Sequence, residues 1–187
     1  MHSDERRSLR RRFRIALTIF IFGLVVSGVT AFPLRWELDL LASAVGVGNP
    51  ASDLESLAGI QYWIAYVRNG LHAAYQDYPF LGYGTDWLAF AHLAIAVFFI
   101  GPLREPEGHD WILKSGLITC FGVFPLALIC GPIREIPFYW RLLDCSFGLF
   151  GSLPLLYCLS ISSRLNGDLT RFDTQPTATN QSSRGRS

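Results

Sequence analysis

Four long blocks of apolar residues, separated by polar segments, dominate the hydrophobic pattern of the chain. They cover residues 15–32, 87–103, 111–132 and 142–161, and the first block contains no charged residue. The amphipathic helix of a soluble protein confines its apolar residues to one stripe, whereas these blocks are apolar on every face. A membrane-spanning helix needs about 20 mostly apolar residues. The pattern therefore predicts an all-α, polytopic membrane protein with four transmembrane helices, in preference to the buried helices of a soluble domain.

The segment 33–86, between the first two blocks, is too long for a plain hairpin loop and predicts structure of its own. Its residues 36–45 favour a short helix. Ser52-Asp53-Leu54-Glu55 has the spacing of a capping box, and apolar residues then recur every three or four positions from Leu54 to Leu71. This periodicity predicts an outer amphipathic helix at about residues 53–76. It would pack as a lid on the spans or, alternatively, gate a site at the outer leaflet.

Basic residues are unevenly divided between the two sides of the predicted bundle. With the amino terminus inside, 12 of the 16 Lys and Arg residues lie on the inner side, in residues 1–14, 104–114 and 162–187. The outer side, including the loop 133–141, keeps four: Arg35, Arg68, Arg134 and Arg141. The positive-inside rule then places both termini in the cytoplasm and makes 104–110 a cytoplasmic hairpin. The basic segment 1–14 is interpreted as a topology anchor, with no nucleic-acid partner, and the polar tail 162–187 is expected to be disordered.

A cleaved secretory signal peptide is the alternative for the first block. Its basic start and apolar stretch fit, and Val29-Thr30-Ala31 loosely resembles a cleavage site. However, the apolar stretch is long for a signal core, and Pro33 follows directly after it. A membrane span is the preferred interpretation.

The composition agrees with a membrane protein and excludes several other classes of protein. The chain has 187 residues, of which 50% are hydrophobic and 17% charged, whereas soluble domains carry about 25% charged residues. So many apolar residues exclude a disordered chain, and four cysteines are too few for a disulfide scaffold. A net charge of +1 predicts no general attraction to nucleic acid.

Ionisable residues near the outer ends of the spans are the candidates for a functional site, because charge inside a bilayer is costly. The candidate polar site comprises Arg35, Asp86, His92, Arg134, Glu135 and Asp144. Asp144 is expected to form an ion pair with Arg134 or Arg141, the alternative being a proton relay. His92 is expected to form an interhelical hydrogen bond, with a ligand or proton-transfer role as the alternative.

The sequence predicts no cofactor and no metal. Haem held by two histidines needs a second intramembrane histidine at the depth of His92, and only His72 of the outer helix could approach it. The four cysteines include no CxxC pair. Cys130 and Cys145 could form a bridge in an oxidising compartment, but free cysteines are the preferred interpretation.

Three pairs of small residues, spaced four apart, are typical of close helix packing in membranes. They are Gly23 and Ser27, Ser115 and Thr119, and Gly148 and Ser152. We expect all three to pack within one compact bundle.

Residues 83–92 (YGTDWLAFAH) and 131–148 (GPIREIPFYWRLLDCSFG) resemble a family of small, uncharacterised bacterial membrane proteins. The resemblance covers the spans and the outer segment. It implies a bacterial multi-span protein, and hence the inner (plasma) membrane, but no catalytic residue.

These features favour a non-enzymatic membrane component, either an accessory subunit or a protein that handles lipids or small molecules. Its expected partners are the lipid bilayer and a membrane protein or second copy. The alternatives are a small transporter or channel, and a membrane enzyme or redox protein that uses His92 and Asp144.

Overall fold

The computed structural model describes residues 3–48 and 54–173, and within them it contains helices and turns without strands. In chain order the elements are α1 (Ser3–Ala31), α2 (Leu34–Ala44), the 3₁₀ turn η1 (Leu54–Ser56), α3 (Gly59–Asp77), α4 (Phe80–Phe98), α5 (Ile100–Arg104), α6 (Asp110–Pro125), the π-helical turn η2 (Leu126–Cys130), α7 (Gly131–Ile133) and α8 (Phe138–Asp173). The predicted all-α fold is confirmed.

Four helical segments are long and apolar enough to cross a membrane. They are Asp4–Ala31, Phe80–Arg104, Asp110–Ile133 and Phe138–Asn166. The segments extend past the predicted apolar blocks because their polar ends continue the helix; the arginine-rich start of α1, for example, is helical from Ser3. Arginine is a good helix former. The chain is therefore a membrane protein by the length and composition of its helices.

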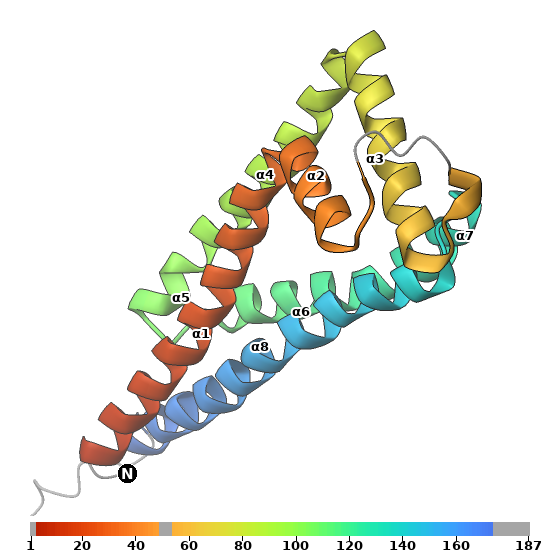
Figure 1. Cartoon of the computed structure of the whole chain (residues 1–187). Coiled ribbons are helices and arrows are strands. Elements are labelled where there is room, and N and C mark those ends of the chain that lie inside the picture. The colour runs from red at the N-terminus through yellow and green to blue at the C-terminus, as the bar shows by residue number, and fades with distance from the viewer. Residues whose placement is uncertain (1–2, 49–53, 174–187) are drawn as a thin grey trace, which may run out of the picture.

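The spans are arranged as two close-packed pairs. One pair is α1 with α4, and the other is α6 with α8; α1 also packs on α8, whereas α4 packs along neither α6 nor α8. Figure 1 shows the pairs diverging from the end near the amino terminus, with α2 and α3 lying between them at the far end. We call the first end the hairpin end, since it carries residues 105–109, and the far end the cap end.

A glycine sets the close spacing within each pair. A Cβ added at Gly28 of α1 would lie 2.9 Å from the Ala89 carbonyl oxygen of α4. A Cβ added at Gly148 of α8 would lie 2.5 Å from the Cys120 carbonyl oxygen of α6. Such small residues allow two helix backbones to approach in a bilayer, where burial of apolar surface does not drive association.

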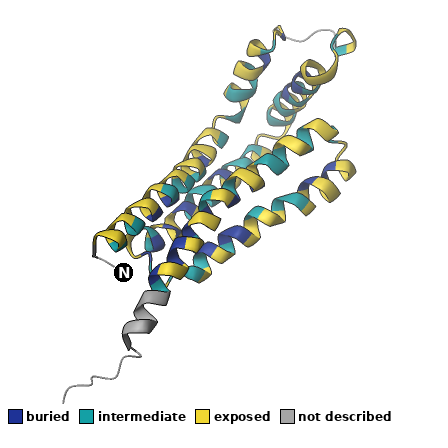
Figure 2. Cartoon of the chain, turned by 90° about the horizontal axis from the view of Figure 1, so that it is seen from below, coloured by how far each residue is buried: buried dark blue, intermediate teal, exposed yellow. Residues whose placement is uncertain are grey.

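The main hydrophobic core lies at the hairpin end. Phe13 and Leu17 of α1, Leu113 of α6 and Leu155 of α8 are all fully buried there, and Phe99, which follows α4, completes the cluster. Elsewhere exposed residues occur along the length of the spans, as Figure 2 shows, and many of them are large and apolar. The chain thus closes its core at one end of the bundle.

The predicted packing of the small residues is right for one pair and wrong for two. Gly148 and Ser152 are buried between α6 and α8. Gly23 and Ser27 are exposed, and Thr119 is exposed while Ser115 is half-buried. The latter two pairs lie on faces that the diverging helix pairs leave uncovered, which the four-residue spacing could not reveal.

The outer amphipathic helix starts later than predicted. Ser52 and Asp53 of the expected capping box lie outside the described residues, and Leu54–Ser56 forms a separate 3₁₀ turn. Ala58 is extended and Gly59 has a φ of +57°, so the chain changes direction before α3 begins. Leu54 and Leu57 nevertheless pack against Ile64 and Ala65 of α3, as their spacing with the later apolar residues suggested.

The expected disordered tail is wrong for its first part, because α8 continues to Asp173. Ser162 and Leu165 are fully buried against the hairpin end, so this stretch belongs to the fold. Residues 174–187 lie outside the described residues.

Candidate functional site

The six residues of the predicted polar site are not brought together. Arg35 is on α2, Asp86 and His92 are on α4, and Asp144 is on α8. Arg134 and Glu135 follow α7 in an exposed turn. Among the described residues, no hydrogen bond or ion pair joins any two of these six side chains.

The expected ion pair of Asp144 is wrong. Within the described part of the chain its carboxylate makes no ion pair. The guanidinium of Arg141 lies instead over the Phe138 ring, 5.2 Å from its centroid, and its aliphatic stem packs on Gly131. Arg141 therefore reaches back along the start of α8 and contacts α7, and the small surface of Gly131 provides the space for it.

The interhelical hydrogen bond expected of His92 is also wrong. Its Nδ1 lies 2.8 Å from the carbonyl oxygen of Leu88, one turn earlier on α4 itself. An intramembrane histidine can satisfy one ring nitrogen in this local way.

A polar network at the cap end joins α2 to α3. The Arg68 Nε donates to Asp39 Oδ1 at 2.6 Å, and His72 Nε2 lies 3.1 Å from the same oxygen. On its other side, His72 Nδ1 lies 3.0 Å from Arg35 Nη2. Arg35 is thus the one member of the predicted site that takes part in a network.

The chemistry of this network is that of a structural fastening. The Arg68 guanidinium, with a smaller contribution from His72, holds the pKa of Asp39 below its ordinary value even though burial opposes the shift. His72 lies within hydrogen-bond distance of Asp39 through Nε2 and of Arg35 through Nδ1, so both ring nitrogens have a partner. The side chain of Arg68 is 6% exposed, so the ion pair binds the middle of α3 to α2.

Helices α2 and α3, which we call the cap, connect the two helix pairs at their far ends. The carboxyl end of α3 leads directly into α4, while its amino end contacts the start of α8. There the Tyr139 hydroxyl donates to the Gly59 carbonyl oxygen at 3.2 Å, and the Trp63 and Trp140 rings lie 6.5 Å apart. Trp and Tyr suit the membrane–water interface, where this contact would lie.

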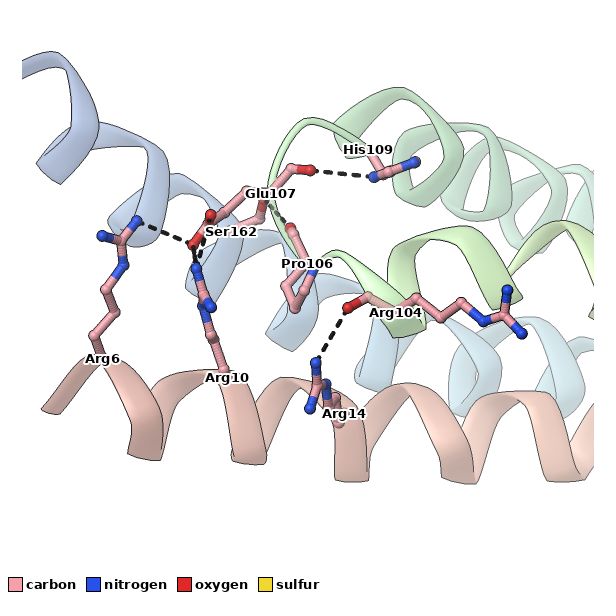
Figure 3. Close-up of polar contacts among 8 residues, drawn as sticks. All are labelled: Arg6, Arg10, Arg14, Arg104, Pro106, Glu107, His109 and Ser162. Atoms are coloured by element: carbon pink, nitrogen blue, oxygen red, sulfur yellow. Dashed lines mark hydrogen bonds and ion pairs between the residues drawn. The ribbon is translucent and has the colours of Figure 1, made fainter. Parts of the chain in front are cut away.

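A second polar cluster lies at the hairpin end and centres on Glu107. The Glu107 carboxylate accepts hydrogen bonds from Arg10 Nη2 at 2.9 and 3.0 Å and from Arg6 Nη2 at 3.1 Å. Figure 3 shows both arginines extending from α1 toward the hairpin. Burial would raise the pKa of Glu107, but the hydrogen bonds and charges of Arg10 and Arg6 outweigh it and lower the pKa below the ordinary value.

Hydrogen bonds fasten the rest of the hairpin to α1 and α8. Arg14 Nη2 donates to the Arg104 carbonyl oxygen at 3.1 Å. On the other side, the buried Ser162 hydroxyl lies within hydrogen-bond distance of the Pro106 carbonyl oxygen, at 3.2 Å, and of the Asp110 carboxylate. The hairpin region therefore joins all four spans directly beside the hydrophobic core.

A groove runs along α1 next to this cluster. Its volume is about 780 Å³. Five arginines line its polar part and three further residues continue it toward the membrane-spanning part of the helix: Arg6, Arg7, Arg10, Arg11, Arg14, Ile15, Thr18 and Ile19.

The described residues offer little for metal or haem ligation. No three His, Cys, Asp or Glu side chains within residues 3–48 and 54–173 gather into a possible metal site. All four cysteines are free, so Cys130 and Cys145 are not bridged. His72 is engaged on both ring nitrogens, with Asp39 and with Arg35.

Comparison with known protein families, curated proteins and solved structures finds no significant match to this chain.

The residues that form the two networks are not among the six predicted site residues, except for Arg35. In the sequence, Asp39, Arg68 and His72 fall in the outer segment 33–86, and Glu107 falls in the hairpin 104–110. A signal was present for α3, because Arg68 and His72 are four residues apart and share a helix face. Nothing in the sequence pairs them with Asp39, or Glu107 with Arg6 and Arg10, because those contacts span 29 or more positions.

Proposed function

We propose that the protein is a non-enzymatic component of a bacterial inner membrane, an accessory subunit whose uncovered helix faces contact another membrane protein. Both termini lie in the cytoplasm in this proposal. The observation that carries it is the divergence of the two helix pairs, which leaves the core closed at the hairpin end only.

The distribution of charge supports the orientation. The start of α1, the hairpin and the end of α8 lie together, and they bring most of the basic residues to one end of the bundle. Basic residues in short segments beside spans favour the cytoplasmic side. The resemblance of residues 83–92 and 131–148 to small bacterial membrane proteins supports the choice of membrane.

The surface of α6 supports a protein partner. Ser115, Thr119 and Gly122 fall on one side of the helix, opposite the buried Leu113 and Leu117. A Cβ added at Gly122 would meet nothing within 4 Å, and the Thr119 hydroxyl donates only to Ser115 of its own helix. We call these three residues the α6 stripe. Small and hydroxyl-bearing residues on a span allow a second helix to approach closely.

The experiment places a photo-crosslinking amino acid at Thr119 in the full-length protein in native membranes. The expected result is one crosslinked protein of defined mass, recovered in stoichiometric amount after gentle solubilisation and identified by mass spectrometry. The same experiment at Phe121 is the matched control, because this exposed residue lies on the same helix about 200° from Thr119. It should crosslink mainly to lipid.

A substitution gives a second measurement. Gly122→Leu should reduce the crosslink from Thr119 by filling the stripe, while Phe121→Leu should leave it unchanged. Each variant is checked for an unchanged unfolding midpoint. The proposal fails if the protein is extracted in lipid nanodiscs as a monomer without a stoichiometric protein, or if Thr119 and Phe121 give the same crosslinks.

A further inference from the structure

The arginine-lined groove of α1 is the feature that neither the fold nor the proposed subunit role accounts for. We propose that it binds one anionic phospholipid, with the phosphate held by Arg7, Arg11 and Arg14 and an acyl chain lying along Ile15 and Ile19. The proposal concerns a binding site and goes beyond the proposed function, because it holds whether or not a protein partner exists.

The charges in the groove are largely uncompensated. Among the described residues, the one carboxylate that forms ion pairs with these five arginines is that of Glu107, which Arg6 and Arg10 share. Arg14 uses one Nη2 hydrogen bond on a backbone carbonyl and keeps its charge unpaired. Arg7 and Arg11 are exposed and have no partner among the described residues. Such a surplus attracts an anion.

Guanidinium groups are well matched to phosphate. They donate two parallel hydrogen bonds to neighbouring oxygens of one phosphate. Arg7, Arg11, Arg14 and Thr18 are spaced by four, three and four residues, so they follow one side of the helix. Several donors can therefore converge on one anion from the same helix face.

The shape of the groove favours a lipid over a soluble anion. From Arg11 to Thr18 helix α1 rises about 10 Å. This side of α1 therefore extends from the headgroup layer into the hydrocarbon. Ile15 and Ile19 are 52% and 63% exposed and continue the groove on the membrane side. A soluble phosphate would leave this apolar part empty, whereas a phospholipid places an acyl chain against it.

The test titrates the full-length protein in detergent micelles with phosphatidylglycerol and counts bound lipid by native mass spectrometry. One phosphatidylglycerol should bind about tenfold more tightly than phosphatidylcholine, which carries the same phosphate and chains without a net charge. The double variant Arg7→Gln/Arg11→Gln should weaken phosphatidylglycerol binding by about 30-fold, because each basic residue near an anionic headgroup contributes about fivefold. Both side chains are exposed and form no hydrogen bond or ion pair with the described residues, so the variant should keep the unfolding midpoint of the wild type.

The matched control is Arg12→Gln/Arg164→Gln. It removes the same charge from exposed arginines at the same end of the bundle, outside the groove. It should change binding by less than about threefold. A second variant, Ile15→Ala/Ile19→Ala, should weaken phosphatidylglycerol binding and leave any binding of soluble glycerol phosphate unchanged.

Three results would overturn the proposal. Equal loss in the two double arginine variants would indicate general charge attraction in place of a site. Equal binding of phosphatidylcholine would show that headgroup charge is not recognised. Binding of glycerol phosphate or inorganic phosphate as tight as that of the lipid would assign the groove to a free anion.

Discussion

The close approach of the α6 backbone to Gly148 of α8 gives the sharpest test of the helix-pair arrangement. Substitution by alanine would place a Cβ 2.5 Å from the Cys120 carbonyl oxygen and 3.2 Å from Val123 Cβ. Ordinary non-bonded contacts begin near 3.5 Å, so α6 and α8 would have to separate by about 1 Å. A backbone oxygen cannot rotate away as a flexible side chain could.

The expected cost follows from two opposing effects. Overpacking of a close contact costs about 1–3 kcal/mol, while alanine in place of glycine within a helix contributes about 0.5–1 kcal/mol of stability. Gly148→Ala should therefore lower the free energy of unfolding by about 1–2 kcal/mol. Gly23→Ala is the matched control, because a Cβ there would meet nothing within 4 Å. It should be neutral or slightly stabilising.

The assay is reversible unfolding of the detergent-solubilised protein by sodium dodecyl sulfate, followed by loss of helical circular dichroism. Gly28→Ala tests the other pair, where the added Cβ would lie 2.9 Å from the Ala89 carbonyl oxygen. Its destabilisation should fall between those of the other two variants. The reasoning is refuted if Gly23→Ala destabilises the protein as much as Gly148→Ala does.

Three further predictions concern the polar networks. Because Arg10 and Arg6 lower the pKa of Glu107, the charge of Glu107 stabilises the fold above a pH of about 4.5, and this contribution is lost as the pH falls through the lowered pKa. The free energy of unfolding of Glu107→Gln should therefore depend less on pH in the acid range than that of the wild type. An equal pH dependence would contradict this. Arg68→Gln should release α2 from α3 and lower the protection free energy of the amides in residues 34–44 by about 1–3 kcal/mol, measured by hydrogen exchange. Unchanged exchange there would show that Arg68 does not hold α2 against α3. Tyr139→Phe should speed amide exchange at the start of α3, because loss of the hydrogen bond to Gly59 lowers the protection free energy by about 0.5–1.5 kcal/mol. Protection equal to that of the wild type would mean that the hydroxyl does not hold α3 against α8.

The two fastened ends have a consequence for motion within the bundle. The hairpin end is closed by the core and by Glu107, whereas the cap end is joined through α3 and its contact with Tyr139. The middle of each helix pair is held mainly within that pair. Any partner that inserts between the pairs would therefore act against the cap contacts before it disturbs the core.

Much of the fold could be predicted from the sequence because it depends on local composition. The four spans follow from long, mostly apolar blocks, and the apolar spacing after Leu54 predicts a helix before the second span. Helix ends were less accurate. The left-handed Gly59 delays α3, and the buried Ser162 and Leu165 keep α8 in the fold beyond the expected end of the fourth span.

The candidate site was harder to predict, because charge and depth alone do not bring side chains together. His92 and Asp144 were chosen as ionisable groups in spans, yet His92 bonds within its own helix and Asp144 has no ion pair in the described chain. The basic segment 1–14 is predicted only as a topology anchor, whereas in the structure Arg6 and Arg10 bind Glu107 and Arg14 donates to the Arg104 carbonyl oxygen.

The membrane class, the four candidate spans and the uneven distribution of charge follow from residues close together in the chain, so local composition predicts them. The pairing of the helices, the outward position of some small residues and the ion pairs between carboxylates and arginines follow from the folded arrangement alone. Those features depend on backbone approach at Gly28 and Gly148 and on contacts as distant as that of Arg6 with Glu107. Helix rotation and pairing set these contacts, and the apolar blocks of the sequence do not indicate which side of each helix faces a neighbour.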